Sequence, residues 1–333
     1  MQRYNTWTDL TAADRGASVA LGNFDGVHLG HRSVIALTQS ASSAPLGIVT
    51  FEPHPRQFFA PHAPAFRLMN AEARAHRMEK IGVARLYELP FTAALADMSA
   101  EGFARTVLAA GLGVTHVVVG ADFRFGKGRT GTATDLQAFG RSLGFGVTVA
   151  DLVAVTGADL VAVTGAGRVS VNGAGQVANV GTEISSTSIR SALSQGRPRD
   201  AARMLGHWHR IEGAVLHGEK RGRALGFPTA NMSLAGLHLP RFGIYASKVD
   251  VLSGPHAGSY DGAASLGVRP MFGANQPNLE TYLFDFDGDL YGEHLSVALV
   301  DYLRPELKFD SLPALITQMQ ADCQHARTRL AAL

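Results

Sequence analysis

Cysteine is almost absent from this sequence, which has only Cys323 among its 333 residues. A single cysteine excludes an intrachain disulfide and is typical of the reducing cytoplasm, where we expect this protein to work. Charge is also scarce, because 17% of the residues are charged and 30 Lys and Arg face 28 Asp and Glu. No run of basic residues stands out, so the sequence gives no support to binding of nucleic acid.

Long uninterrupted apolar runs are missing as well. The first residues, MQRYNTWTDL, have no apolar core and predict no secretory signal peptide. The most apolar region, residues 144–167, is interrupted by Asp151, Asp159 and several glycines, so it predicts no membrane span. A length of 333 residues with 46% hydrophobic content instead favours two globular domains with ample cores.

The segment VALGNFDGVHLGH, residues 19–31, has the most distinctive pattern of the first half. It predicts the end of a buried strand, a tight turn, and a helix that begins near residues 27–30. Glycines at both ends of the turn permit positive φ and the close approach of a ligand. A helix start presents unpaired N–H groups and partial positive charge. The turn therefore predicts an anion site made by Gly22, Asn23, Phe24, Asp25 and Gly26.

His28 and His31 are spaced three residues apart at this helix start, on one helical face. Two imidazoles beside an anion site suit nucleotidyl transfer, in which they would neutralise the triphosphate as pyrophosphate leaves. A helix-start turn with surface histidines and a two-histidine metal site are the alternatives. No cysteine or carboxylate cluster completes a metal site, so the pattern favours nucleotide binding.

The rest of the first half alternates strands with helices. Apolar runs predict strands at residues 46–51, 86–89 and 116–119, and helices cover residues 70–80 and 99–108, capped by Asn70 and Ser99. This order predicts an α/β fold with a parallel, doubly wound sheet. Pro53 and His54 follow the second strand at its carboxyl end, where open sheets of this kind bind ligands.

The loop at residues 120–131 follows a strand and mixes acidic, aromatic and basic side chains. Asp122, Phe123, Phe125 and Arg129 suit stacking on a planar ring and contact with phosphate. The alternative is a surface loop with both phenylalanines folded onto the core, and the two interpretations have equal weight here.

Residues 184–190, ISSTSIR, precede a helix that runs to about residue 193. Ser185, Ser186 and Thr187 are good helix caps. The alternative interpretation is a second phosphate clamp, in which these hydroxyls and Arg190 hold the leaving pyrophosphate.

Residues 150–157, ADLVAVTG, recur unchanged as residues 158–165. Two copies are too few for a solenoid, and we interpret them as a tandem duplication, each copy a short strand with a Thr-Gly turn. A further helix begins at residues 196–200 and ends near Gly206. We place the boundary there, between domains at residues 1–206 and 207–333.

After residue 206 helical periodicity nearly vanishes. Short alternating segments predict strands at residues 210–216, 245–251, 259–265, 280–286 and 294–303. Their spacing and their Gly-, Pro- and Asp-rich turns predict an antiparallel β-barrel. A final helix from about residue 312 should pack on the barrel through one apolar face, made by Leu315, Ile316, Met319, Cys323, Ala326 and Leu330.

Two stretches of this half carry candidate chemistry. A Gly-rich basic turn would cradle ATP phosphates through Gly218, Lys220, Gly222 and Arg223. Thr229 and Asn231 follow as candidate ligands of Mg²⁺, since this ion prefers oxygen and keeps several waters. Glu280 lies at the start of a predicted strand, and taken alone it is best explained as an exposed strand carboxylate.

Together these motifs resemble the bifunctional bacterial riboflavin kinase/FAD synthetase family along nearly the full length. The first half matches at residues 22–31 (GNFDGVHLGH), 50–55 (TFEPHP), 120–126 (GADFRFG) and 184–190 (ISSTSIR). The second half matches at residues 221–231 (RGRALGFPTAN), at Glu280, and at residues 284–292 (FDFDGDLYG) and 303–309 (LRPELKF). Two departures are Ala121, where an acidic or aromatic residue is common, and Met271, where the family's Gly-x-Arg-Pro-Thr has threonine.

The resemblance implies two reactions. The barrel would phosphorylate riboflavin with ATP to give FMN, and a Rossmann-like nucleotidyltransferase domain would join FMN to AMP from a second ATP, giving FAD and pyrophosphate. Because a ribityl hydroxyl is a poor nucleophile, the kinase needs a carboxylate to accept its proton, and Glu280 matches the family's base. The implied flavin contacts are Pro53, His54, Asp122, Phe123, Phe125, Arg129 and Arg304.

Beyond riboflavin, FMN, ATP and Mg²⁺ we expect no nucleic-acid or membrane partner, and a monomer or weak homo-oligomer. Three rival functions remain: a flavin-sensing binding protein, an enzyme with one activity, and a nucleotidyltransferase for another phosphate substrate. Ala121 and Met271 favour the first, whereas intact His28, His31 and Glu280 oppose it. The third leaves the barrel unexplained.

Overall fold

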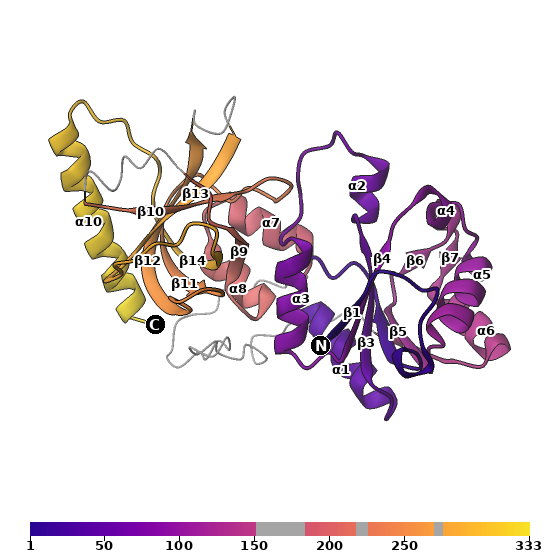
Figure 1. Cartoon of the computed structure of the whole chain (residues 1–333). Helices are drawn as coiled ribbons and strands as arrows, with labels where there is room; N and C mark the ends of the chain where they lie inside the picture. Colours follow the sequence, from indigo (N-terminus) through magenta and orange to yellow (C-terminus); the bar gives the residue numbers. More distant parts are fainter. Residues whose placement is uncertain (151–183, 218–225, 270–275) are drawn as a thin grey trace. The chain divides into compact units, whose positions relative to one another are not determined.

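A computed structural model describes residues 1–150, 184–217, 226–269 and 276–333 of the chain (Figure 1). The chain divides into two compact units. The first contains Met1–Pro64 and Arg74–Ala154, and the second contains Ala65–Ala73 and Val155–Leu333. The repeat at residues 151–165, the basic turn at 218–225 and Met271 lie outside the described residues.

The first unit is built on a six-stranded sheet in the order β1-β4-β3-β2-β5-β8. Every neighbouring pair is parallel, which confirms the predicted doubly wound sheet. Its strands are β1 (Gln2–Tyr4), β2 (Ser18–Leu21), β3 (Leu46–Glu52), β4 (Arg85–Pro90), β5 (His116–Gly120) and β8 (Gly146–Ala150). The sequence analysis named β2, β3, β4 and β5 and missed the two edge strands, β1 and β8.

Helices cover both faces of this sheet. Its helices are α1 (Leu29–Ala41), α2 (Pro55–Phe59), α3 (Ala71–Lys80), α4 (Ala93–Ala96), α5 (Ala100–Gly102), a π-helix at Phe103–Leu112 and α6 (Ala133–Leu143). Val19, Leu21 and Val117 pack with the π-helix and α6, whereas the hydroxyl of Ser18, on the opposite face, donates to the Thr38 carbonyl of α1. The predicted caps are confirmed, because the Ala73 N–H donates to Asn70 Oδ1 and the Gly102 N–H donates to Ser99 Oγ.

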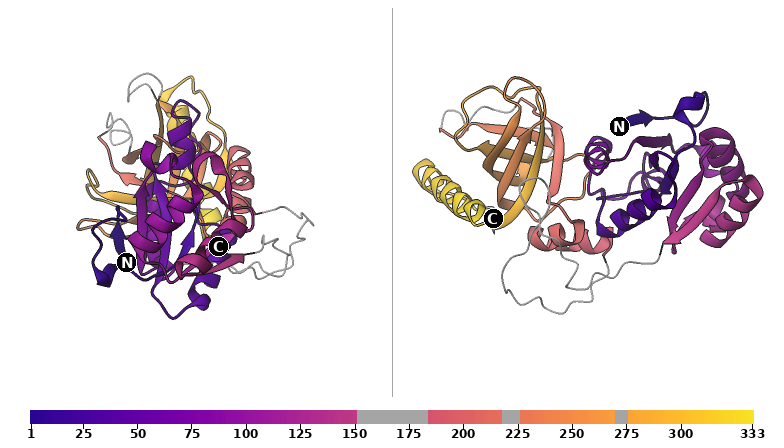
Figure 2. Two further views of the ribbon diagram at one scale, coloured as in Figure 1. Left: turned by 90° about the vertical axis from the view of Figure 1, so that its right-hand side faces the viewer. Right: turned by 90° about the horizontal axis from the view of Figure 1, so that it is seen from below.

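The second unit contains a six-stranded antiparallel sheet in the order β10-β13-β12-β11-β14-β9, which curls into the predicted barrel form (Figure 2). Its strands are β9 (His209–Ala214), β10 (Thr229–Ser233), β11 (Gly243–Val251), β12 (Gly258–Arg269), β13 (Gln276–Leu283) and β14 (His294–Arg304). The two edges meet in one bridge beyond β9, where the Leu216 N–H donates to the Asn231 carbonyl over 2.8 Å. This single bridge links the two edges of the curled sheet around its core.

The terminal helix α10 (Leu312–Ala331) packs on this barrel as predicted. Ala326 and Leu330 are buried against Ala246, Phe284 and Val300. The rest of the predicted face, Leu315, Ile316, Met319 and Cys323, is partly exposed. Helices α7 (Ser186–Ser194) and α8 (Pro198–Leu205) also belong to this compact unit. The division into catalytic domains at residue 206 stays a prediction.

Two strand predictions need correction. The strand expected at residues 280–286 is β13, which covers Gln276–Leu283 and ends before Asp285, whose φ is +56°. A positive φ at a non-glycine residue is incompatible with a continuing strand. β10 was not predicted as a strand at all, although it carries Thr229 and Asn231.

Candidate functional site

The turn between β2 and α1 is fixed from both sides. The Gly22 N–H donates to the Val49 carbonyl over 3.1 Å, and Thr50 Oγ1 donates to the Asn23 carbonyl over 3.2 Å. The expectation that both glycines supply positive φ is wrong for Gly22. Positive φ occurs at Gly26 (+87°), Phe24 (+52°) and Val27 (+45°). Strained backbone of this kind persists where the surrounding structure holds it, and is common at ligand sites.

The remaining members of the predicted anion site differ in exposure. Asn23 is exposed, whereas the side chains of Phe24 and Asp25 are buried. A Cβ on Gly22 would lie 3.4 Å from the Phe24 ring, an ordinary van der Waals contact, so the ring packs directly over this glycine. Phe24 can thus meet a ligand only through its backbone.

His28 and His31 form a stacked pair at the start of α1. Their ring centroids are 3.6 Å apart with an interplanar angle of 16°. His28 is the N-cap of the helix, and its Nδ1 accepts the His31 N–H over 3.3 Å. His31 Nδ1 is buried and has no hydrogen-bond partner among the described residues. Desolvation by burial, and then the neighbouring His28, hold the pKa of His31 well below its ordinary range. His31 is therefore neutral in the free protein, and an anion bound nearby would favour its protonation.

This turn lies at the topological switch point of the sheet. The chain leaves β2 toward β3 on one side and leaves β5 toward β8 on the other, and β2 and β5 are neighbours. Open α/β sheets bind ligands at the carboxyl ends of two such strands. The turn at residues 22–28 follows β2 and the loop at 120–131 follows β5, so the topology brings the two predicted ligand segments to one place.

The loop after β5 is partly ordered by a two-stranded ribbon, β6 (Arg124–Phe125) and β7 (Gly131–Thr132). Phe125 is 8% exposed and packs in the core, and the half-buried Phe123 stacks on it with centroids 5.5 Å apart. Both phenylalanines thus fold onto the core, as the alternative interpretation had it. Asp122 and Arg129 are exposed, and their contact with flavin stays a prediction.

An aromatic cluster that the sequence analysis missed lies beside Pro53 and His54. His54 caps α2, where its Nδ1 accepts the Arg56 N–H over 3.0 Å. The Phe91 ring contacts the rings of Phe51, Phe58 and Phe59, with centroids 5.7, 5.3 and 5.7 Å away. Phe59 is 67% exposed. The pair of phenylalanines at residues 58–59, two residues beyond TFEPHP, was the available signal for this surface.

The motif at residues 184–190 begins α7 in the second compact unit. Ser185 Oγ accepts the Ser188 N–H over 3.2 Å, so the helix-cap interpretation is confirmed for this residue. Arg190 Nη2 donates to Thr187 Oγ1 over 3.1 Å, and Nη1 donates to the Phe66 carbonyl over 3.4 Å. The role of Ser185, Ser186, Thr187 and Arg190 toward pyrophosphate stays a prediction.

In the barrel, the buried side-chain amide of Asn278 on β13 joins Asn231, on the neighbouring strand β10, to Glu280 on β13. Asn231 lies opposite Glu280 in the strand register. Asn278 Nδ2 donates to Asn231 Oδ1 and to Glu280 Oε1, both over 3.3 Å. Asn278 is 2% exposed and Asn231 is 7% exposed. Asn278 was not predicted, because an isolated asparagine in a strand carries no sequence signal.

Glu280 lies in the middle of β13 rather than at its start. Its neighbours Leu279 and Thr281 are both fully buried, and Glu280 is partly exposed on the opposite face, as the strand alternation predicts. Asn231 Nδ2 donates to the Thr229 carbonyl over 3.3 Å, and Thr229 lies opposite Tyr282, two residues along β13 from Glu280. The predicted phosphate residues Gly218, Lys220, Gly222 and Arg223 lie outside the described residues.

Arg304, a predicted flavin contact, makes a bidentate ion pair with Asp322 of α10. Its Nε and Nη2 donate to the two carboxylate oxygens over 2.8 and 2.6 Å. This pair fastens the helix to the end of β14, and any contact with flavin stays a prediction.

Among the described residues, no group of three or more His, Cys, Asp or Glu side chains is placed to hold a metal ion. Within the same residues, no helix is long and apolar enough to cross a membrane.

The two halves of the chain match two different protein families. Residues 10–163 match the FAD synthetase family and residues 205–330 match the riboflavin kinase family. The bifunctional riboflavin kinase/FMN adenylyltransferase of Pseudomonas fluorescens is 38% identical over 98% of this chain and 97% of its own length. That of Listeria monocytogenes is 34% identical over 98% and 95%. A crystal structure titled macrolide-efflux protein, from Streptococcus pneumoniae, has a TM-score of 0.73 and 27% identity over 96% of each chain.

The fold, the two groups of polar side chains and these matches define a transferase with two catalytic units, each acting on a nucleotide. The chain belongs to the family of bifunctional riboflavin kinase/FMN adenylyltransferases, the enzymes of flavin biosynthesis that make FMN and FAD.

Proposed function

We propose that the barrel unit phosphorylates the ribityl 5′-hydroxyl of riboflavin with ATP, and that the parallel-sheet unit adenylylates the resulting FMN. The observation that carries the first assignment is the buried Asn278, which joins Glu280 to Asn231. The stacked histidine pair at the switch point supports the second. Riboflavin, FMN and ATP are the substrates, and Mg²⁺ accompanies the ATP.

In the kinase reaction, Glu280 accepts the proton of the attacking hydroxyl. Asn278 holds Glu280 Oε1, so the carboxylate does not need to be oriented when the substrate arrives. Asn231, opposite Glu280, and Thr229, two residues before it on β10, would offer neutral oxygens to Mg²⁺, an ion that prefers oxygen ligands. The bound ion would neutralise the charge of the ATP phosphates.

In the adenylyl transfer, no base is needed, because the FMN phosphate is already an anion. Positioning and charge neutralisation supply the catalysis. His31 is neutral and partly desolvated in the free protein, so the arriving triphosphate raises its proton affinity and it can then donate to phosphate oxygen. His28 fixes the helix start through its Nδ1 and stacks on the His31 ring.

We place the isoalloxazine ring of FMN near the exposed Phe59 and His54. A planar aromatic ligand suits an exposed aromatic ring that its neighbours hold in place, and Phe59 makes T-shaped contacts with Phe58 and Phe91. This surface replaces Phe125 as the expected stacking platform, because Phe125 is committed to the core.

The test is to incubate the purified protein with riboflavin, ATP and Mg²⁺ and to separate the flavins by chromatography. We expect FMN to form first and FAD to follow, with release of pyrophosphate. FMN without FAD would leave an enzyme with one activity, and no new flavin would favour the flavin-sensing protein. A second incubation with FMN and ATP tests the adenylyl transfer alone.

A further inference from the structure

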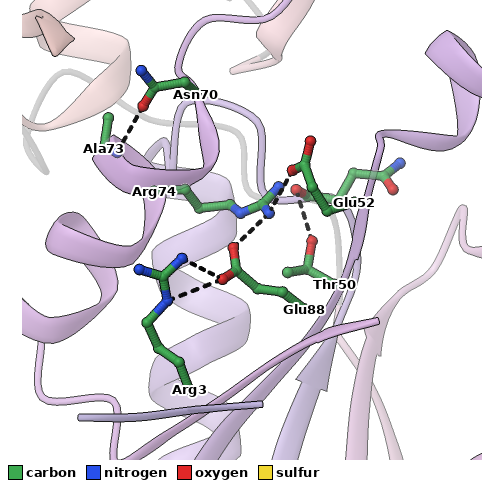
Figure 3. A network of polar contacts seen from close by, with 8 residues as sticks. Arg3, Thr50, Glu52, Asn70, Ala73, Arg74 and Glu88 are labelled. Carbon is green, nitrogen blue, oxygen red and sulfur yellow. Dashed lines mark hydrogen bonds and ion pairs between the residues drawn. The ribbon is translucent and has the colours of Figure 1, made fainter. Parts of the chain in front are cut away.

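A network of charged side chains centred on the buried Arg74 lies toward the carboxyl ends of β3 and β4 in the first unit (Figure 3). Arg74 of α3 is 1% exposed, and its Nη2 donates to Glu52 Oε2 over 3.0 Å and to Glu88 Oε1 over 2.8 Å. Arg3 of β1 donates to the other Glu88 oxygen from Nε over 3.1 Å and from Nη2 over 2.8 Å. One guanidinium nitrogen therefore connects the last residue of β3 to the middle of β4.

Stability alone does not account for this arrangement. Burying a guanidinium is costly, and a buried ion pair replaced by apolar side chains of similar volume is often neutral or stabilising. Arg74 Nε is buried without a hydrogen-bond partner among the described residues, so the burial of this group is only partly compensated. The network therefore calls for a function other than stability.

The location of Glu52 supplies that function. Glu52 is the last residue of β3, and Pro53 and His54 follow it directly. Its carbonyl accepts the Phe91 N–H over 3.1 Å, so its backbone is tied to the central ring of the aromatic cluster. Its carboxylate is one-third exposed, with a side-chain exposure of 34%, and Arg74 holds it from the buried side. The same strand reaches the histidine turn two residues earlier through Thr50 and Asn23.

We propose that Arg74 is a positioning residue for FMN. By holding the Glu52 carboxylate, it fixes the start of the segment that carries Pro53 and His54 and keeps Glu52 facing the flavin side of the site. Arg74 itself does not contact the ligand, because it is buried. This inference rests on the proposed adenylyl transfer, and it deepens that function by naming what orders its flavin-binding segment.

The test is the KM for FMN in the adenylyl transfer, measured separately from kcat and from the KM for ATP. The double variant Arg74→Met/Glu88→Met removes the two most buried charges together. The charges left in the network, on Arg3 and Glu52, are 39% and 34% exposed, so water can solvate them and the variant should fold. We expect this variant to raise the KM for FMN about tenfold. This effect is smaller than the roughly 10²-fold loss of rate that misplacing a reacting group can cause. The KM for ATP and the kinase activity of the second unit should not change.

Three further variants separate positioning from folding. In the parent protein a single nitrogen of Arg74 donates to both carboxylates, and the one ammonium group of Arg74→Lys could do the same. The KM of this variant for FMN should therefore stay within about threefold of the parental value. Arg3→Met removes a partner of Glu88 without touching Glu52, and should leave that KM unchanged. If Arg74 acts through Glu52, adding Arg74→Met to Glu52→Gln should raise the KM no further.

The proposal would be overturned if the double variant had an unchanged KM for FMN. It would also be overturned if only kcat fell, in proportion to the fraction of the protein that is folded. Full additivity of Arg74→Met and Glu52→Gln would overturn the route through Glu52. A parent protein that makes no FAD would instead refute the proposed function itself, and this inference with it.

Discussion

Asn278 shows how one residue can organise a site that sequence patterns reveal only in part. Residue type and spacing were sufficient to name Thr229 and Asn231 as candidates, and the family resemblance named Glu280. The proximity of Asn231 and Glu280 depends on the register of β10 with β13. The register of two paired strands is set by which alternate residues are buried and by the geometry of the turns. Because β10 was not predicted as a strand, its register with β13 could not be predicted either. The amide that joins them was invisible for the same reason.

Burial is the other property that the sequence could not predict at the residue scale. His31 was expected to neutralise charge, yet desolvation keeps it neutral in the free protein. Phe125 was interpreted from the sequence either as a stacking residue or as part of the core, and it is a core residue. For both residues, the sequence indicates which chemistry the side chain can perform but not how deeply the side chain is buried.

At this scale we first predict the effect of Glu280→Gln. The amide keeps the size and hydrogen bonding of the side chain but cannot accept the proton, so the kinase kcat should fall by about 10²–10⁴-fold. The KM for ATP should change little, and supplied FMN should still become FAD at the parental rate. Steady-state kinetics of both reactions check this, and riboflavin phosphorylated as fast as by the parent would contradict it.

We next predict an acid-sensitive stability from His209. This residue is 3% exposed, its Nε2 contacts the Leu68 carbonyl over 3.1 Å, and burial lowers its pKa from 6.5 to about 4. The bond to Leu68 opposes this shift, and the nearby His238 adds to it. Between these two pKa values the unfolded chain binds a proton that the folded chain does not, so the free energy of unfolding falls as the pH falls.

The expected loss from His209 is about 2 kcal/mol between pH 7 and pH 5. His209→Gln removes the titrating group while an amide can still donate to the Leu68 carbonyl. Urea unfolding of parent and variant at both pH values should therefore show a smaller loss in the variant. Equal losses would mean that this histidine does not contribute to the acid sensitivity.

At the scale of elements, the alternation of strand and helix was sufficient to predict the parallel sheet, and the short alternating segments were sufficient for the barrel. The elements that were missed are short or lie at an edge. β1 and β8 are the two edges of the parallel sheet, and β10, an edge of the antiparallel sheet, has the sequence TANMS, which contains no run of apolar residues. The wrong bounds of β13 follow from Asp285, because its positive φ ends the strand inside an apolar run that otherwise continues.

The docking of α10 gives a prediction at this scale. Asp322 pairs with Arg304, and the two side chains are 10% and 17% exposed. Asp322→Ala would leave a largely buried guanidinium unpaired and should lower the free energy of unfolding by about 3 kcal/mol. Chemical denaturation measures this.

A matched control comes from the same helix. Arg327 of α10 makes a bidentate pair with the exposed Asp285, over 2.8 Å for both bonds. Asp285→Ala should have a much smaller effect, because exposed ion pairs contribute little. If the two substitutions destabilise the protein equally, burial does not determine the contribution of these pairs.

At the scale of the whole molecule, each unit has its own hydrophobic core. The two activities should therefore be lost separately. His28→Ala or His31→Ala should lower FAD formation from FMN by about 10²–10³-fold, the usual effect of removing a preorganised donor at a reacting centre. Riboflavin phosphorylation should continue at the parental rate.

The exposed His62, in the same unit, is the control for removing an imidazole, and His62→Ala should leave both activities unchanged. Chromatography of the flavins formed from riboflavin and from FMN measures both reactions. A double variant of His28 and His31 that makes FAD at nearly the parental rate would remove the pair from the mechanism. Parallel loss of both activities would show that the units do not act separately.

The bridge that closes the barrel has one more consequence. The backbone carbonyl of Asn231 accepts the Leu216 N–H, and its side-chain Oδ1 accepts a hydrogen bond from Asn278. Asn231 therefore belongs both to the seam, defined as the bridge between the two edges of the barrel sheet, and to the proposed kinase site. Ligands that immobilise Asn231 should also suppress the opening of this seam. The Leu216 amide is therefore expected to exchange its hydrogen for deuterium more slowly when ATP and riboflavin are bound, and to report occupancy of the kinase site without any turnover.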